Sequence, residues 1–255
     1  MKNATFLMRL AGVALFISLL CGTANARLAG HNVILVHGLI IEDLIQPPSR
    51  QQILDRRKLS DFWHARAEGL LNWSAADRLE GGIAEIVYQQ ALDHARNGLC
   101  DQGCVLVTHS TGDLVSRYFM QHQEAWLRAA GYAPLNIIAT IDYAGAGGGT
   151  DLADLAVAAA NSEYIPTPLK WAAGAILGMD LDVTDYDELG VVLDLTTSRA
   201  RNIAMAPQSV PRLRFSVNGG DLLEPGMGQV RTITKTIIRG ADDTVVPAHS
   251  SCGAS

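Results

Sequence analysis

Short apolar runs alternate with longer amphipathic stretches along most of the chain. Runs of β-branched and aliphatic residues occupy 32–36 (NVILV), 104–108 (CVLVT) and 136–142 (NIIATID). Such runs are typical of strands that are buried on both faces of a parallel sheet. Two further strands are predicted at 212–217 and 232–239.

The segments between these runs have helical character. Within 59–97 the apolar residues recur at helical spacing and define one apolar face, formed by Ile83, Ile86, Val87, Ala91 and Leu92. Residues 113–130 and most of 152–202 are also rich in helix formers, whereas the polar segment 42–58 is predicted to be a long loop. The glycine cluster at 145–149 is predicted to be flexible. Strands that alternate with helices predict one α/β domain with a mainly parallel sheet.

Residues 1–26 have the features of a secretory signal peptide. Lys2 and Arg9 form a positive region, an apolar run follows at 10–21, and small residues at 24–26 precede the expected cleavage site. The apolar run is shorter than the ~20 residues that span a bilayer, which favours cleavage over a membrane anchor. We therefore expect an exported protein, secreted or periplasmic, whose mature domain comprises residues 27–255.

Composition excludes several classes of protein. Apolar residues make up 48% of the chain and charged residues 18%, as in a globular domain and unlike a disordered segment. The formal net charge is −6, and the expected leader contains two basic and no acidic residues, so its removal makes the charge −8. An acidic chain without long basic runs is a poor candidate for binding nucleic acid.

Three cysteines follow the expected leader. Cys100 and Cys104 are close enough in sequence to form a disulfide in an oxidising compartment, and two free thiols are the alternative. Cys252 then has no evident partner.

The segment from Thr108 to Gly112 (THSTG) lies where a predicted strand meets a predicted helix. It fits the nucleophile-elbow pattern G-x-S-x-G, in which a sharp turn exposes the serine oxygen above the sheet, although Thr108 replaces the first glycine. A serine that caps the following helix is the alternative interpretation. The position directly after a buried strand favours Ser110 as a nucleophile.

The tripeptide His37-Gly38-Leu39 ends the first predicted strand. A tetrahedral oxyanion needs preorganised N–H donors. One comes from the residue after the nucleophile, here Thr111, and one from the loop after an earlier strand, for which Leu39 is the candidate. We interpret His37 as a residue that orients this loop rather than as a catalytic group.

A candidate catalytic acid follows the strand predicted at 232–239, in the segment GADDTVVP. A carboxylate at a strand end can orient a histidine and stabilise its protonated form. Asp242 and Asp243 can both fill this role, and the spacing of the neighbouring glycine, valine and proline favours Asp243. Of the seven histidines, His249 alone follows Asp243.

Together these motifs resemble those of α/β-hydrolases, and specifically of secreted bacterial triacylglycerol lipases. The resemblance rests on five segments in the family's order, ILVHGL, VTHSTGDLVSRY, GGGTDLADLA, LTTSRARNIAMAPQSVP and GADDTVVPAHSSC. It implies a mainly parallel sheet flanked by helices, with a helical lid insertion at about 151–205. The implied activity is hydrolysis of carboxylic esters of lipids through an acyl-enzyme on Ser110.

The sequence departs from this family near its end. Family members place the catalytic histidine well beyond the acid, after a helix and one last strand, whereas His249 stands six residues after Asp243. We interpret His249 as a loop histidine, with a base that swings in from the same loop as the alternative. The expectation is a chain that stops before the last strand and the catalytic histidine.

The resemblance also bears on cofactors and partners. Related lipases bind a structural calcium with an aspartate of the loop that contains Asp221, but a solvated turn aspartate is the favoured interpretation here, and no cofactor is expected. The expected partners are an ester or lipid substrate, a transient lipid interface and, as in some family members, a dedicated chaperone for secretion.

Two alternative activities, acyl transfer and polyester depolymerisation, use the same catalytic machinery. A non-catalytic binding protein with this fold, or an inactive fragment, is the competing hypothesis.

Overall fold

The computed structural model describes residues 30–56, 66–161, 164–177, 180, 186–203, 210–216, 238 and 245–253. The chain divides into the units Met1–Gly30 and His31–Ser255, and every assigned element belongs to the second unit. The signal peptide predicted at 1–26 and most of the strand predicted at 232–239 lie outside the described residues.

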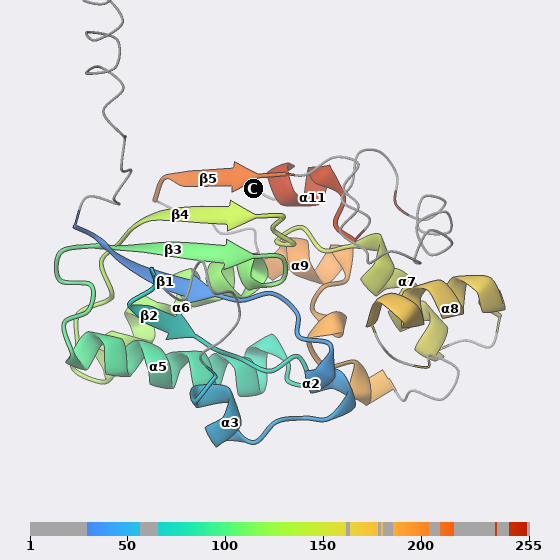
Figure 1. The fold of residues 1–255 in the computed structure, drawn as a ribbon, viewed down its shortest axis with the longest axis horizontal. Coiled ribbons are helices and arrows are strands. Elements are labelled where there is room, and N and C mark those ends of the chain that lie inside the picture. Colours follow the sequence, from blue (N-terminus) through green and yellow to red (C-terminus); the bar gives the residue numbers. More distant parts are fainter. Residues whose placement is uncertain are drawn as a thin grey trace, which may run out of the picture. The chain divides into compact units, whose positions relative to one another are not determined.

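Five parallel strands form one sheet in the order β2-β1-β3-β4-β5 (Figure 1). They are β1 (Asn32–Val36), β2 (Gly69–Leu71), β3 (Cys104–His109), β4 (Ile137–Tyr143) and β5 (Arg212–Phe215). The register pairs Val36 with Thr108 and Thr108 with Asp142, so the carboxyl ends of the three central strands meet at one edge. Four of the five predicted strands are confirmed, and β1 and β3 are buried over most of their length, as predicted for central strands.

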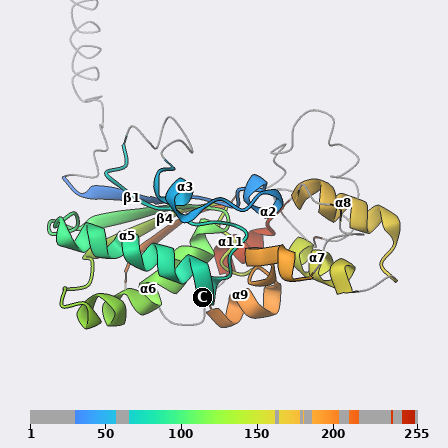
Figure 2. The same cartoon turned by 90° about the horizontal axis from the view of Figure 1, so that it is seen from below.

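Helices connect the strands. They are α2 (Glu42–Ile45), α3 (Arg50–Leu54), the π-helical turn η1 (Leu79–Ile83), α5 (Ala84–Arg96), α6 (Gly112–Ala129), α7 (Asp151–Asn161), α8 (Thr167–Leu177), the 3₁₀ helix η2 (Tyr186–Leu193), α9 (Thr197–Ile203) and α11 (Ala248–Gly253). Helices α5 and α6 cover the same face of the sheet (Figure 2). The segment 151–205, predicted to be a helical insertion, contains α7, α8, η2 and α9, and α7 and α8 lie beyond the carboxyl ends of the strands (Figure 1).

Two predictions about local structure are wrong. The segment 42–58, predicted to be a loop, contains α2 and α3, and α3 begins with a capping box in which Ser49 Oγ accepts the Gln52 N–H while the Gln52 side chain accepts the Ser49 N–H. The segment 59–97, predicted to be helical, contains strand β2, which pairs with β1. A strand of three residues is too short to show a period of two in the sequence.

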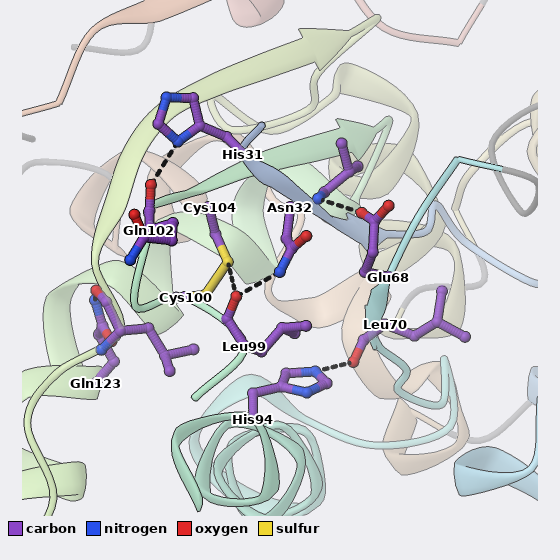
Figure 3. Close-up of a disulfide and its surroundings, with 12 residues drawn as sticks. His31, Asn32, Glu68, Leu70, His94, Leu99, Cys100, Gln102, Cys104 and Gln123 are labelled. Atoms are coloured by element: carbon purple, nitrogen blue, oxygen red, sulfur yellow. Dashed lines mark hydrogen bonds between the residues drawn. A yellow bond between two sulfur atoms is a disulfide. The ribbon is translucent and has the colours of Figure 1, made fainter. Parts of the chain in front are cut away.

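A disulfide joins Cys100 to Cys104, which confirms the bridged alternative (Figure 3). Both cysteines are buried at the amino edge of the sheet, where Cys104 is the first residue of β3 and Cys100 lies in the turn before it. The loop that the disulfide closes is fastened to the start of β1, because Asn32 Nδ2 donates to Leu99 O at 2.7 Å and His31 Nδ1 lies 2.6 Å from Gln102 O. The side chain of Cys252 lies outside the described part of the structure.

The hydrophobic core lies between the sheet and its helices. Ile34 of β1 and Leu106 of β3 are fully buried, as are Leu114 and Phe119 of α6. This packing joins β3 and α6, the two elements on either side of Ser110, through one core. Within the described ranges, no helix combines the length and the apolarity that a membrane span requires.

Candidate active site

Ser110 occupies the sharp turn between β3 and α6. Its φ angle is 52°, one of two positive values among the non-glycine residues described. Backbone bonds hold the turn on both sides, since the Ser110 N–H donates to Tyr143 O at 3.0 Å and Ser110 O accepts the N–H of Ala146 at 2.9 Å. The residue is half-buried at the carboxyl edge of the sheet. The strand–turn–helix context predicted for the elbow is therefore present around Ser110.

Two glycines bring the end of β1 against this turn. A Cβ atom on Gly112 would lie 2.4 Å from both Val36 O and His37 O, so α6 starts directly on the backbone of β1. A Cβ atom on Gly38 would lie 3.1 Å from Ser110 Cβ and 2.8 Å from His109 Nδ1. Real Cβ atoms do not approach other heavy atoms below about 3 Å, because hard-sphere repulsion forbids it. Glycine at both positions therefore allows the 37–39 loop to lie beside Ser110.

The two amide groups predicted to bind an oxyanion flank this contact. Leu39 follows Gly38 in the loop, and Thr111 follows Ser110 at the start of α6. Among the residues that the structure describes, no acceptor takes the N–H of Leu39 or of Thr111. Thr111 is buried, and buried N–H groups normally have a partner, so an unused donor beside a half-buried serine is suited to bind an incoming oxygen.

His37 is locked beneath the loop as a neutral imidazole. Its Nδ1 lies 2.7 Å from Gly38 O, and its Nε2 accepts the Trp73 N–H at 3.2 Å, which places the proton on Nδ1. The ring stacks on Trp73 with centroids 4.8 Å apart, and Trp73 Nε1 donates to His37 O. Burial, joined by the charge of Arg56, lowers the pKa of His37 to about 3. These contacts support the interpretation of His37 as a residue that orients the loop.

Asp243 lies outside the described residues, but the segment after it is fastened near the site. Thr150 Oγ1, in the loop after β4, donates to Val245 O at 2.5 Å, and Ser250 Oγ donates to Gly149 O at 2.6 Å. His249 lies in α11 and is exposed. No hydrogen bond joins His249 to Ser110 within the described part of the chain.

A cluster of buried charges behind the elbow was not predicted from the sequence. Asp113 Oδ1 accepts Arg117 Nε at 2.9 Å and Arg212 Nη2 at 2.8 Å. Asp142 Oδ1 accepts the Thr108 hydroxyl at 2.8 Å, and its Oδ2 lies 2.6 Å from Arg212 Nε in an ionic contact. Burial raises the pKa of Asp142 to about 6, repulsion from Asp113 adds to the rise, and Arg212 opposes it. Only the i,i+4 spacing of Asp113 and Arg117 on a predicted helix signals this cluster in the sequence.

The described residues offer no group of three or more His, Cys, Asp and Glu side chains that could hold a metal ion. Asp221, the candidate calcium ligand, lies outside those residues. The described geometry places Ser110 next to the loop of Leu39 and directly before Thr111.

Several solved structures resemble this chain. The mature lipase BlEst2 of Bacillus licheniformis aligns over 87% of this chain and 78% of its own, with a TM-score of 0.53 and 13% identity. Staphylococcus hyicus lipase aligns over 88% and 80% (TM-score 0.48, 15% identity), and EstA of Clostridium botulinum over 88% and 74% (TM-score 0.48, 14% identity).

No family model matches the sequence, and no curated protein resembles it significantly. At 13% identity, the likeness to BlEst2 concerns the fold. In this chain β5 is an edge strand next to β4, and the serine turn follows the central strand β3. The chain therefore has the α/β-hydrolase fold, which it shares with the bacterial lipase BlEst2.

Proposed function

We propose that the protein is a serine ester hydrolase in which Ser110 is the nucleophile. The observation that carries the proposal is the position of Ser110 on a left-handed turn, between two backbone N–H groups that have no acceptor among the described residues. A turn of this kind costs about 1–3 kcal/mol at a non-glycine residue and is found mainly where function requires it. Backbone donors without an acceptor beside a serine suit acyl transfer.

In the proposed reaction, Ser110 Oγ attacks the carbonyl carbon of the ester while a histidine takes the hydroxyl proton. The N–H groups of Leu39 and Thr111 bind the oxyanion of the tetrahedral intermediate. The histidine then returns the proton to the leaving alcohol, and an acyl-enzyme remains on Ser110. Water, activated by the same histidine, attacks the acyl-enzyme and releases the acid. Asp243 orients the histidine in this scheme, and His249, which we interpret as a loop histidine, is the less favoured candidate for that base.

Hydrolysis of p-nitrophenyl butyrate tests the proposal. Ser110→Ala removes the nucleophile, so in a form of the protein that carries the catalytic histidine we expect the rate to fall by about 10³-fold or more, to the level that binding and the oxyanion donors alone sustain. Ser198→Ala is the matched control, because Ser198 is an exposed serine of α9. The proposal fails if the Ser110→Ala variant hydrolyses the ester as fast as the Ser198→Ala control.

Lipid esters are the proposed substrate class. Large apolar side chains are exposed on and around α8, where Trp171 is 50% exposed and Tyr164 is 96% exposed. Exposed aromatic residues of this size favour contact with an apolar surface, here the surface of a lipid aggregate. BlEst2, which shares the fold, is a lipase.

Trp171→Ser tests this substrate class. We expect the variant to lose activity on emulsified tributyrin while it keeps the wild-type rate on dissolved p-nitrophenyl butyrate, because only the first assay requires contact with a lipid surface. Equal losses on both substrates would contradict a role at the interface.

Export is part of the same proposal. The Cys100–Cys104 disulfide favours an oxidising compartment, since cytosolic proteins rarely keep structural disulfides. N-terminal sequencing of the exported protein should find Arg27 as the first residue. A mature protein that retains Met1 would contradict cleavage.

A further inference from the structure

The carboxylate of Asp113 is enclosed on all sides directly behind Ser110. It is fully buried, and three groups donate to it. Arg117 Nε and Arg212 Nη2 donate to Oδ1, at 2.9 and 2.8 Å, and the Gly147 N–H donates to Oδ2 at 3.1 Å. These donors come from α6, from the start of β5 and from the loop after β4. One carboxylate therefore joins three elements that are far apart in the sequence.

The same loop also holds the backbone of Ser110. Ser110 O accepts the Ala146 N–H at 2.9 Å and the Asp113 N–H at 3.1 Å. Ala146 and Gly147 are consecutive, so one amide of the loop binds the nucleophile's own carbonyl and the next amide binds Asp113. A left-handed serine persists only where its surroundings fix it. The bond from Gly147 to Asp113 fixes the loop that in turn fixes Ser110.

Glycine is needed in this loop because it passes directly over the buried carboxylate. A Cβ atom on Gly145 would lie 2.6 Å from Asp113 Oδ2. A Cβ atom on Gly147 would lie 2.6 Å from the same oxygen and 2.4 Å from Arg117 Nε. The whole cluster 145–149 is buried. Close packing on Asp113 and Arg117, rather than the predicted flexibility, therefore explains these two glycines.

We propose that Asp113 is a positioning residue for Ser110. Its carboxylate, held by two guanidinium groups, fixes the loop after β4 so that the Ala146 N–H stays bonded to Ser110 O and the serine hydroxyl stays aimed at the substrate. Asp113 does not touch the reacting atoms. The inference rests on the proposed function, because it assigns Asp113 an effect on the reactivity of Ser110.

Asp194 provides a matched control for the test. It is also fully buried, and it also accepts two arginines and one backbone amide, namely Arg78, Arg199 and the Leu79 N–H. None of these partners belongs to the elbow or to the loop after β4. Asp113→Asn and Asp194→Asn therefore remove the same kind of charge from similar surroundings, and only the first touches the contacts of Ser110.

The experiment compares kcat and KM for p-nitrophenyl butyrate, per folded molecule, in wild type, Asp113→Asn, Asp194→Asn and Ser110→Ala. We expect kcat to fall about 10-fold to 100-fold in Asp113→Asn with KM changed less than twofold, since a small misplacement of a reacting group costs up to ~10² in rate. Asp194→Asn should keep kcat within twofold. Equal kcat values in the two asparagine variants overturn the inference, whereas wild-type hydrolysis by Ser110→Ala overturns the proposed function instead.

Amide hydrogen exchange supplies a second measurement that does not depend on activity. In Asp113→Asn, the peptide that contains residues 144–148 should exchange at least 10-fold faster than in wild type, because the Gly147 N–H loses its charged acceptor. If that variant does not fold, Gly147→Ala replaces it, since the added methyl group must displace Asp113 or Arg117 while it leaves their charges in place. Unchanged exchange of this peptide in the folded variant overturns the inference.

Discussion

The left-handed backbone conformation of Ser110, and not its side chain, distinguishes the site from an ordinary helix cap. The sequence pattern around Ser110 was enough to predict the turn, because small residues and a following helix are local features. The partners that support the turn were not predictable in the same way. Arg212 reaches Asp113 across 99 residues of sequence, and a charged residue without known neighbours is expected at the surface.

Gly112→Ala tests the close approach of α6 to β1. The added methyl group would lie 2.4 Å from two carbonyl oxygens of the backbone, which cannot move independently. We expect a loss of about 1–3 kcal/mol in the free energy of unfolding, as in other overpacked sites, together with a lower kcat. Urea denaturation and ester hydrolysis measure the two effects.

Gly131→Ala is the control, because Gly131 has a positive φ of 84° and open space around it. It should cost roughly 1–2 kcal/mol through backbone strain and leave kcat unchanged. A Gly112→Ala variant with wild-type kcat would contradict the placement of the elbow against the end of β1.

Two buried groups act on acid stability in opposite directions. The pKa of His37 is lowered to about 3, so below pH 6.5 the unfolded chain takes up a proton that the folded chain does not, and stability falls with falling pH. The pKa of Asp142 is raised to about 6, so between about pH 6 and 4 the folded chain takes up the extra proton, and stability rises with falling pH. Over pH 7 to 5 the two contributions largely cancel.

Asp142→Asn should expose the contribution of His37. Between pH 7 and pH 5 we expect the variant to lose about 1 kcal/mol more unfolding free energy than wild type, because one pKa unit corresponds to about 1.4 kcal/mol and the opposing carboxyl is gone. Urea titrations at the two pH values measure the difference. An identical pH dependence in both proteins would contradict the raised pKa of Asp142.

At the scale of elements, prediction succeeded where a pattern was long enough to repeat. The strands β1, β3 and β4 and the helix α6 were predicted to within about two residues, since buried strands and amphipathic helices both leave a periodic or continuous apolar pattern. Strand β2 was missed because its three residues gain their conformation from pairing with β1. The helices α2 and α3 are four and five residues long, too short for a helical period to be visible.

The disulfide at the amino edge of the sheet is a structural feature of the element β3. Cys100→Ser combined with Cys104→Ser should lower the free energy of unfolding by about 2 kcal/mol, the loop-closure contribution of a five-residue loop. Activity of the folded variant should be unchanged, because the disulfide and Ser110 lie at opposite ends of β3.

Reduced wild-type protein is the comparison for this variant and should show the same loss in urea denaturation. A variant that is as stable as the oxidised wild type would contradict a stabilising role of the bridge. A variant that folds normally but loses activity would contradict the separation of the bridge from the site.

At the scale of the whole molecule, the alternation of strands and helices was sufficient to predict the fold class, and the oxyanion motif predicted that the loop with Leu39 lies beside Ser110. Ser110, Gly38 and the loop that contains Leu39 do come together at one edge of the sheet. Asp243 and its role remain a prediction, since Asp243 lies outside the described residues. The likeness to BlEst2 supports the fold, while the proposed chemistry depends on Ser110 itself.

Covalent labelling of Ser110 by a fluorophosphonate tests the central claim most directly. The reagent reacts with serines that are activated as nucleophiles and flanked by oxyanion donors. We expect mass spectrometry of the digested protein to find the phosphonate on the peptide that contains Ser110, with no labelling in Ser110→Ala and full labelling in Ser198→Ala. A native protein that stays unlabelled would contradict the assignment of Ser110 as the nucleophile. Equal labelling of the Ser110→Ala variant would contradict it as well.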